Sequence, residues 1–422
     1  MANFKKFKLD NGLRVILVPQ PSSFATSVAV LVEAGSKYET KDINGLSHFL
    51  EHMCFKGTKK RPSALTISSE LDGLGAQYNA FTSREFTSYY AKSKNDSTEK
   101  LLEIISDLYL NPVFNEAEIE KEKGVIIEEI NMYEDVPQRK IQDLFTELLY
   151  GDQPAGWDIA GRKEVIQSLK RDDFIKYRSK HYLPQATTIV ISGGFKDNGL
   201  EEQIKSYFGG LRPDLKGEKL KVIDEQAEPK ELVKFKESDQ THLVMGFRAF
   251  DAKDERRYAL EVLCDILGGS MSSRLFQKIR DELGAAYYVN AGADLSTDHG
   301  YVAMSAGINH QKIEEVIKAG LQEFKRFKEE KVSEEELVRA KDHIAGHLYL
   351  SLETSDELGY FYGMPEIMGL ELKTPEELIK EIRAVSAEDI QKVANEILTE
   401  KTLNFAVIGP FKEKSFRDML RM

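Results

Sequence analysis

Residues 45–53 read Gly45-Leu46-Ser47-His48-Phe49-Leu50-Glu51-His52-Met53. His48 and His52 are four residues apart, and on a helix this spacing places both imidazoles on one face. Glu51 stands next to His52, close enough to that face to reach the same point. Two neutral imidazoles suit Zn²⁺, and a nearby carboxylate suits a proton acceptor for water on the metal. The H-x-x-E-H order therefore predicts a metal-binding helix.

The residues around this motif indicate that the helix is buried. The apolar side chains are those of Leu46, Phe49, Leu50, Met53 and Phe55. Burying a histidine or a glutamate without a partner costs on the order of 1–3 kcal/mol, so these polar groups need one. A metal ion would be such a partner, but it requires a third protein ligand.

A long acidic stretch at 115–133 contains the candidates for that ligand. Its second half carries several aliphatic residues, which indicates that one side of a helix is buried there. Glu122 and Glu129 are seven residues apart, or two helical turns, and so share a face. Glu128 competes with Glu129, and periodicity does not separate the two.

Length and charge limit the class of protein. A chain of 422 residues exceeds one ordinary core and predicts at least two domains. Its net charge of −12 argues against nucleic acid and anionic membranes as partners. Two cysteines are too few for a disulfide framework. We find no secretion signal, transit segment or apolar run long enough to span a bilayer, and we expect a cytoplasmic protein.

Similar segments in the two halves of the chain indicate a duplication. A helix-like segment leads from Asp173 into a β-branched strand and Phe195, 22 residues later, and the same arrangement leads from Asp389 to Phe411. The offset is 216 residues, about half the chain. We therefore predict a first domain at 1–211, a polar linker at 212–230 and a second domain of duplicated fold at 231–422.

The second half lacks a copy of the metal motif. The segment that corresponds to the metal helix, 258–268, contains no histidine. A different pair, His343 and His347, is also spaced four apart, but it has no glutamate between its members. We interpret this pair as ordinary helix residues, and we expect a single zinc ion per chain, bound in the first half.

Four motifs, in this order, resemble the pitrilysin/insulinase family of zinc metallopeptidases. They are the stretch Gly45–Met53 followed by Phe55-Lys56-Gly57-Thr58; Asn79-Ala80-Phe81-Thr82-Ser83; Glu122-Lys123-Gly124-Val125-Ile126-Ile127-Glu128-Glu129; and Ser273–Arg280 with Leu283–Tyr287. The similarity covers nearly the whole chain, and it is greatest to the short branch that includes the mitochondrial processing peptidase.

The resemblance implies a role for each matched residue. His48, His52 and Glu129 would bind Zn²⁺, with Glu51 as general base and Glu122 as a supporting carboxylate behind the ligands. Glu128 would lie outside the site. Asn79, Ala80 and Phe81 match an edge strand that binds a peptide substrate as an added strand. Arg280 and Tyr287 match a pair that contacts the substrate and the developing oxyanion.

The resemblance also implies the architecture and the partners. Each half would be an α+β domain, a mostly antiparallel sheet backed by helices, with the fold described as LuxS/MPP-like after LuxS and the mitochondrial processing peptidase. The chain would be a zinc endopeptidase that cleaves unfolded peptides in a chamber closed by two chains, as a homodimer or as a heterodimer with a related subunit. The alternative is a non-catalytic or partner-dependent subunit of such a heterodimer.

Overall fold

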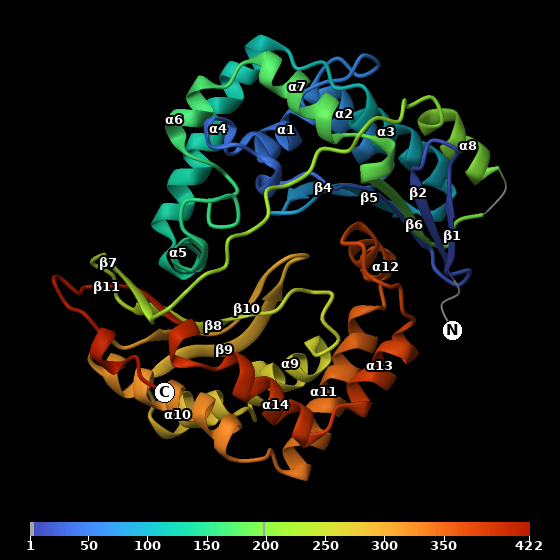
Figure 1. The fold of residues 1–422 in the computed structure, drawn as a ribbon. Helices are drawn as coiled ribbons and strands as arrows, with labels where there is room; N and C mark the ends of the chain where they lie inside the picture. The colour runs from blue at the N-terminus through green and yellow to red at the C-terminus, as the bar shows by residue number, and fades with distance from the viewer. Residues whose placement is uncertain (1–3, 197–198) are drawn as a thin grey trace. The chain divides into compact units, whose positions relative to one another are not determined.

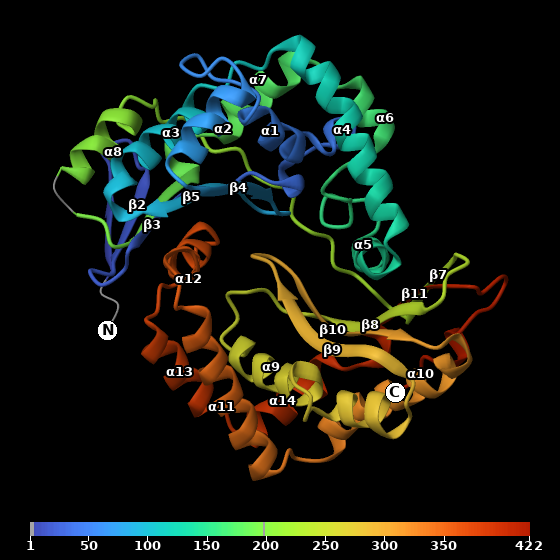
Figure 2. The same ribbon diagram turned by 180° about the vertical axis from the view of Figure 1, so that it is seen from behind.

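The computed structural model describes residues 4–196 and 199–422, which form two compact units. The first unit contains the chain up to Asn131, Trp157–Leu220 and Tyr349–Thr374. The second contains Met132–Gly156, Lys221–Leu348 and Pro375–Met422. Each unit is a mostly antiparallel sheet covered by helices, so the α+β architecture predicted from the sequence is confirmed (Figures 1 and 2).

The sheet of the first unit has six strands in the order β1-β2-β6-β3-β5-β4. The strands are β1 (Lys5–Lys8), β2 (Arg14–Pro19), β3 (Ala25–Val32), β4 (Gln77–Thr82), β5 (Thr87–Lys94) and β6 (Thr187–Gly193). Neighbours pair antiparallel except β2 and β6, which are parallel. β6 is buried along its whole length, which agrees with its β-branched composition. β4 is the last strand at one edge.

Helices cover both faces of this sheet. They are α1 (Leu46–Cys54), α2 (Ala64–Gly73), α3 (Thr98–Leu110), α4 (Glu116–Asp135), α6 (Lys163–Ser168), α7 (Arg171–His181), α8 (Leu200–Phe208) and α12 (Ser355–Ile367). Successive side chains of a strand point to opposite faces. On β2, Val15 and Leu17 therefore join the core under α1, α3 and α7, whereas Ile16 and Val18 join the core under α12.

The second unit repeats this plan with five strands in the order β7-β11-β8-β10-β9. The strands are β7 (Lys230–Phe235), β8 (Thr241–Ala249), β9 (Ala286–Leu295), β10 (Gly300–Ile308) and β11 (Leu403–Gly409). β7 and β11 are parallel, and the other pairs are antiparallel. The helices are α5 (Pro137–Tyr150), α9 (Arg257–Cys264), α10 (Ile313–Glu329), α11 (Glu334–Ser351), α13 (Pro375–Ala384) and α14 (Ala387–Ile397).

The 216-residue offset inferred from the sequence recurs between equivalent elements. It relates β2 to β7, β6 to β11 and α7 to α14, and in each of these pairs both bounds are shifted by this amount. The equivalent strands also occupy equivalent places, since β2-β6-β3-β5-β4 corresponds to β7-β11-β8-β10-β9. Two sheets of one design are therefore encoded in tandem.

Each unit also takes one helix from the other half of the sequence. Ile141 and Phe145 of α5, from the first half, pack on Val244 and Ile408 in the sheet of the second unit. In the first unit, Leu358 and Tyr362 of α12 pack on the β2–β3–β6 face. The units therefore differ from the contiguous division at 212–230 expected above, because an apolar sheet face in each is covered by a helix distant in sequence.

None of the helices in the described ranges is both long enough and apolar enough to cross a membrane.

Candidate metal centre

A buried carboxylate holds the N-terminus of α1. The Oε2 of Glu39 accepts a hydrogen bond from the backbone N–H of Gly45 at 2.8 Å, and its Oε1 accepts one from Ser47 at 2.6 Å. These N–H groups have no acceptor within the helix itself. Burial raises the pKa of Glu39 to about 7, although these hydrogen bonds favour the ionised form. Gly45 has a φ of 99°, and a Cβ there would lie 2.6 Å from the Ala160 carbonyl oxygen.

Helices α1 and α4 bring together three side chains that could hold a metal ion. The Oε2 of Glu129 lies 3.7 Å from His48 Nε2 and 3.6 Å from His52 Nε2. The two imidazole rings are 4.6 Å apart, centre to centre. In the described part of the chain, these three residues form the one group of three or more histidine, cysteine or acidic side chains whose donor atoms all lie within 4.8 Å of one another.

This donor set fits Zn²⁺. A tetrahedral zinc ion with bonds of ~2.1 Å separates its ligand atoms by about 3.4 Å, close to the distances between Glu129 and the two histidines. Two imidazoles and one carboxylate also leave the fourth position of such an ion open for water or substrate, as in catalytic zinc sites. The geometry therefore matches a catalytic rather than a closed structural site.

Glu122 lies behind His52 and fixes its orientation. The Nδ1 of His52 donates a hydrogen bond to Glu122 Oε1 at 2.9 Å, which leaves Nε2 directed to Glu129. Lys56 Nζ lies 2.6 Å from the other carboxylate oxygen. Burial alone would raise the pKa of Glu122, but the hydrogen bonds from His52 and Lys56 outweigh it and lower this pKa. The carboxylate is thus kept ionised beside the ligand.

Glu51 is buried and held by the end of β4. Its Oε2 accepts a hydrogen bond from Thr82 Oγ1 at 2.8 Å. Burial raises the pKa of Glu51, opposed by the hydrogen bond from Thr82 and by the neighbouring His52. A carboxylate with an elevated pKa is suited to take up and release a proton near neutral pH. Thr82 connects this group directly to the edge strand.

The three residues expected to bind substrate lie on β4. They are Asn79, Ala80 and Phe81. On one side of the strand they pair with β5, where their register partners are Tyr90, Tyr89 and Ser88, respectively. β4 ends the sheet, so no other described strand of this sheet pairs with its second side, and an edge strand is the kind of element to which a peptide can add. Thr82 follows these residues, so a peptide along β4 would lead to Glu51.

Arg280 and Tyr287 belong to the second unit, whereas the metal-binding cluster belongs to the first. They lie near each other, with the Arg280 guanidinium carbon 6.0 Å from the centre of the Tyr287 ring. Tyr287 is 74% exposed.

Glu128 is also exposed and accepts a hydrogen bond from Asn131 at 3.4 Å, so it points away from the histidines.

Sequence reasoning assigned no role to Glu39, Lys56 and Thr82. Thr82 directly follows Asn79–Phe81, and Lys56 stands one helical turn after His52, so spacing offered a signal for these two. Glu39 is six residues before Gly45, across an irregular segment. Its contact depends on a backbone path that helical periodicity does not describe.

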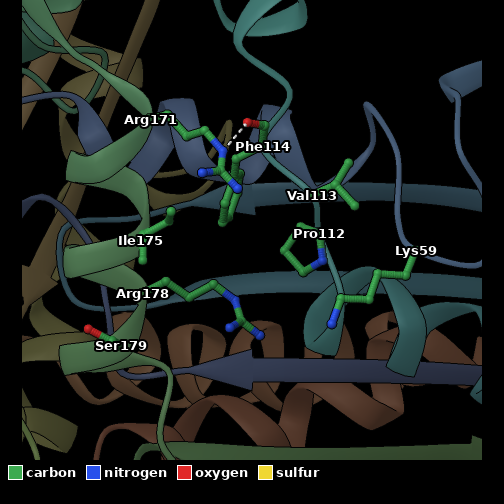
Figure 3. A pocket seen from close by; sticks show the side chains of 8 residues that line it. All are labelled: Lys59, Pro112, Val113, Phe114, Arg171, Ile175, Arg178 and Ser179. Atoms are coloured by element: carbon green, nitrogen blue, oxygen red, sulfur yellow. Dashed lines mark hydrogen bonds between the residues drawn. The ribbon is translucent and has the colours of Figure 1, made fainter.

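A separate pocket of about 330 Å³ lies in the first unit, between α7 and the segment that follows α3 (Figure 3). Arg171 Nε donates to the Phe114 carbonyl at 3.0 Å, and Arg178 donates to the carbonyls of Tyr109 and Leu110 at the end of α3. These hydrogen bonds hold α7 against the C-terminal end of α3 and the segment that follows it. The lining residues do not include His48, His52 or Glu129.

Comparison with known proteins identifies two family matches. Residues 14–163 match the family described as Insulinase (Peptidase family M16), and residues 168–344 match the Peptidase M16 inactive domain. An uncharacterized zinc protease of Bacillus subtilis is 34% identical over 406 residues, which cover 96% of this chain and 98% of the relative. One of Rickettsia felis is 34% identical over 419 residues, covering 98% and 99%.

Solved structures share the fold. A protease from Helicobacter pylori has a TM-score of 0.90 with 22% identity, covering 97% of this chain and all (100%) of the other. A structure described as a peptidase M16 inactive domain from Pseudomonas fluorescens has a TM-score of 0.88 with 18% identity, covering 98% and 100%. At these identities the likeness is one of fold.

Proposed function

The chain belongs to the insulinase family of peptidases, family M16, and on that basis we propose that it is a zinc-dependent endopeptidase acting on unfolded peptides. The observation that carries this proposal is the convergence of His48, His52 and Glu129. In addition, Glu122 accepts a hydrogen bond from Nδ1 of His52, the ring nitrogen that faces away from Glu129. The names of the relatives, zinc proteases, support the same kind of activity.

In this proposal His48 and His52 hold the ion through Nε2, and Glu129 holds it through a carboxylate oxygen. Zinc, when bound, supplies a Lewis acid that activates water and polarises the scissile carbonyl. Glu51 takes the proton of the attacking water and delivers it to the nitrogen of the leaving amine. Thr82 orients Glu51 through its hydrogen bond, and Glu122 keeps His52 in the tautomer that exposes Nε2.

The substrate is an extended peptide that pairs with β4 at Asn79, Ala80 and Phe81. Backbone hydrogen bonds give such an interaction affinity that depends little on sequence, and they require an unfolded segment. Arg280 and Tyr287 contact the substrate and stabilise the oxyanion, either in their own chain or in a second one. We propose that two chains form the catalytic chamber, as a homodimer or with a related subunit. The expected cytoplasmic location stays a prediction.

A second candidate is a non-catalytic or partner-dependent subunit of a heterodimeric processing peptidase. The match of residues 168–344 to an inactive-domain family covers the half that carries no metal motif, so it is compatible with both candidates. The full ligand set in the first half, together with Glu51, favours a catalytic chain.

The purified full-length chain, incubated with a fluorogenic unstructured peptide, tests the proposal. We expect hydrolysis that a chelator abolishes and that Zn²⁺ restores. Chelator-resistant hydrolysis would exclude zinc catalysis. Bound zinc without hydrolysis of any peptide would favour the subunit alternative.

A further inference from the structure

The second unit contains a histidine pair that the peptidase mechanism does not use. His343 and His347 lie one turn apart on α11, and their ring centres are 4.2 Å apart. The corresponding separation between His48 and His52 is 4.6 Å. The two pairs therefore present their imidazoles at similar spacing, on two helices of different units.

A carboxylate outside α11 orients His343. The Nδ1 of His343 donates a hydrogen bond to Asp265 Oδ1 at 2.7 Å. His52 is bonded in the same way to Glu122 at 2.9 Å. Occupation of Nδ1 in a neutral imidazole leaves the lone pair of Nε2 available, which is the usual arrangement for histidines that bind metals.

The backbone around Asp265 is shaped to admit this carboxylate. Asp265 begins a π-helical turn, Asp265–Gly269, directly after α9, and Gly268 within it departs from helical angles. A Cβ on Gly269 would lie 2.5 Å from Asp265 Oδ1, so a larger residue there would displace the carboxylate. Glu261 stands one turn earlier on the same side of the helix, and burial together with the neighbouring Asp265 raises the pKa of Glu261 to about 7.

We propose that His343 and His347 form a second divalent transition-metal site, with Asp265 as its positioning residue. Imidazole ligands select ions of the Zn²⁺, Ni²⁺ and Cu²⁺ class. In the described ranges the pair has no third side chain placed as Glu129 is for His48 and His52. Water completes the coordination, and the site binds more weakly than the one in the first unit.

Equilibrium dialysis of the metal-free full-length protein against Zn²⁺, followed by elemental analysis, tests this site. We expect a tight and a weak ion per chain. His347→Ala should keep the tight ion and lose the weak one, and Asp265→Asn should weaken the weak site by about 10- to 100-fold. His310→Ala is the matched control, since this histidine of the same unit bonds Thr241 and not the pair.

A His52→Ala variant separates this proposal from the peptidase proposal. It should lose the tight ion and hydrolytic activity while keeping the weak ion. His347→Gln, which preserves side-chain length, replaces His347→Ala if far-UV circular dichroism shows that the alanine variant is unfolded. Zinc binding that is identical in the wild-type, His343→Ala and folded His347 variants would overturn the second site, whatever the fate of the first.

Discussion

Glu122 Oε1 accepts a hydrogen bond from His52 Nδ1 at 2.9 Å, and this contact joins the two helices that supply the three proposed zinc ligands. It determines which nitrogen of His52 faces Glu129. Lys56 bonds the second oxygen of Glu122, so the carboxylate is held from both sides. The arrangement makes Glu122 a positioning residue rather than a ligand.

Glu122→Gln should weaken zinc binding by about 10- to 100-fold, because a metal-bound histidine depends on its outer hydrogen bond. Competition with a chromogenic chelator measures this affinity. Peptidase activity should return at saturating Zn²⁺, at least in part. An unchanged affinity would contradict the role given to the Glu122–His52 bond.

Glu129→Gln should remove stoichiometric zinc, because the carboxylate supplies the third donor and its charge. Glu128→Gln is the matched control, as the neighbouring side chain is exposed and bonds Asn131 instead. Elemental analysis after dialysis distinguishes them. Loss of zinc from the Glu128 variant, with retention in the Glu129 variant, would reverse the assignment.

Thr82→Val should lower kcat/KM by roughly 10- to 100-fold, the loss of one hydrogen bond to a charged group, without changing zinc content. Valine keeps the shape of threonine but cannot donate to Glu51 Oε2. Thr82→Ser keeps the hydroxyl and should restore most of the activity. If kcat/KM falls as far in the serine variant as in the valine variant, the hydrogen bond from the hydroxyl to Glu51 is not the cause of the loss.

His181 gives the first unit a pH dependence. It is buried, and burial lowers its pKa from 6.5 to about 4. Because the unfolded chain takes up this proton near pH 6.5 and the folded chain only near pH 4, the free energy of unfolding falls as the pH drops through that window. The full effect is up to about 3 kcal/mol.

His181→Gln should reduce this dependence, since glutamine does not titrate. Urea unfolding of both proteins at pH 7 and pH 5 measures the difference. If the wild type and the variant lose the same free energy of unfolding between pH 7 and pH 5, His181 does not take up a proton on unfolding.

The sequence predicted the H-x-x-E-H helix because its spacing is a local pattern, and it predicted the duplication because two similar segments occur 216 residues apart. The H-x-x-E-H spacing sufficed for α1, and the repeated helix–strand segments gave the 216-residue offset that relates β6 to β11. Periodicity left Glu128 and Glu129 unresolved, because adjacent helix positions differ by only 100° and burial decides between them.

The exchange of α5 and α12 between the two units was beyond sequence reasoning. Each helix could be expected from its own pattern, but which sheet its apolar face covers is a tertiary choice. The same holds for Glu39, whose bonds to Gly45 and Ser47 require a particular irregular path. Long-range partners of this kind appear only once the chain is folded.

The most direct test of the proposed peptidase mechanism is to measure zinc content and peptide hydrolysis together in Glu51→Gln. We predict one tightly bound zinc ion per chain, as in the wild type, with kcat reduced by about 10²- to 10⁴-fold because the proton acceptor is lost. Normal zinc content with wild-type turnover would contradict the assignment of Glu51 as general base.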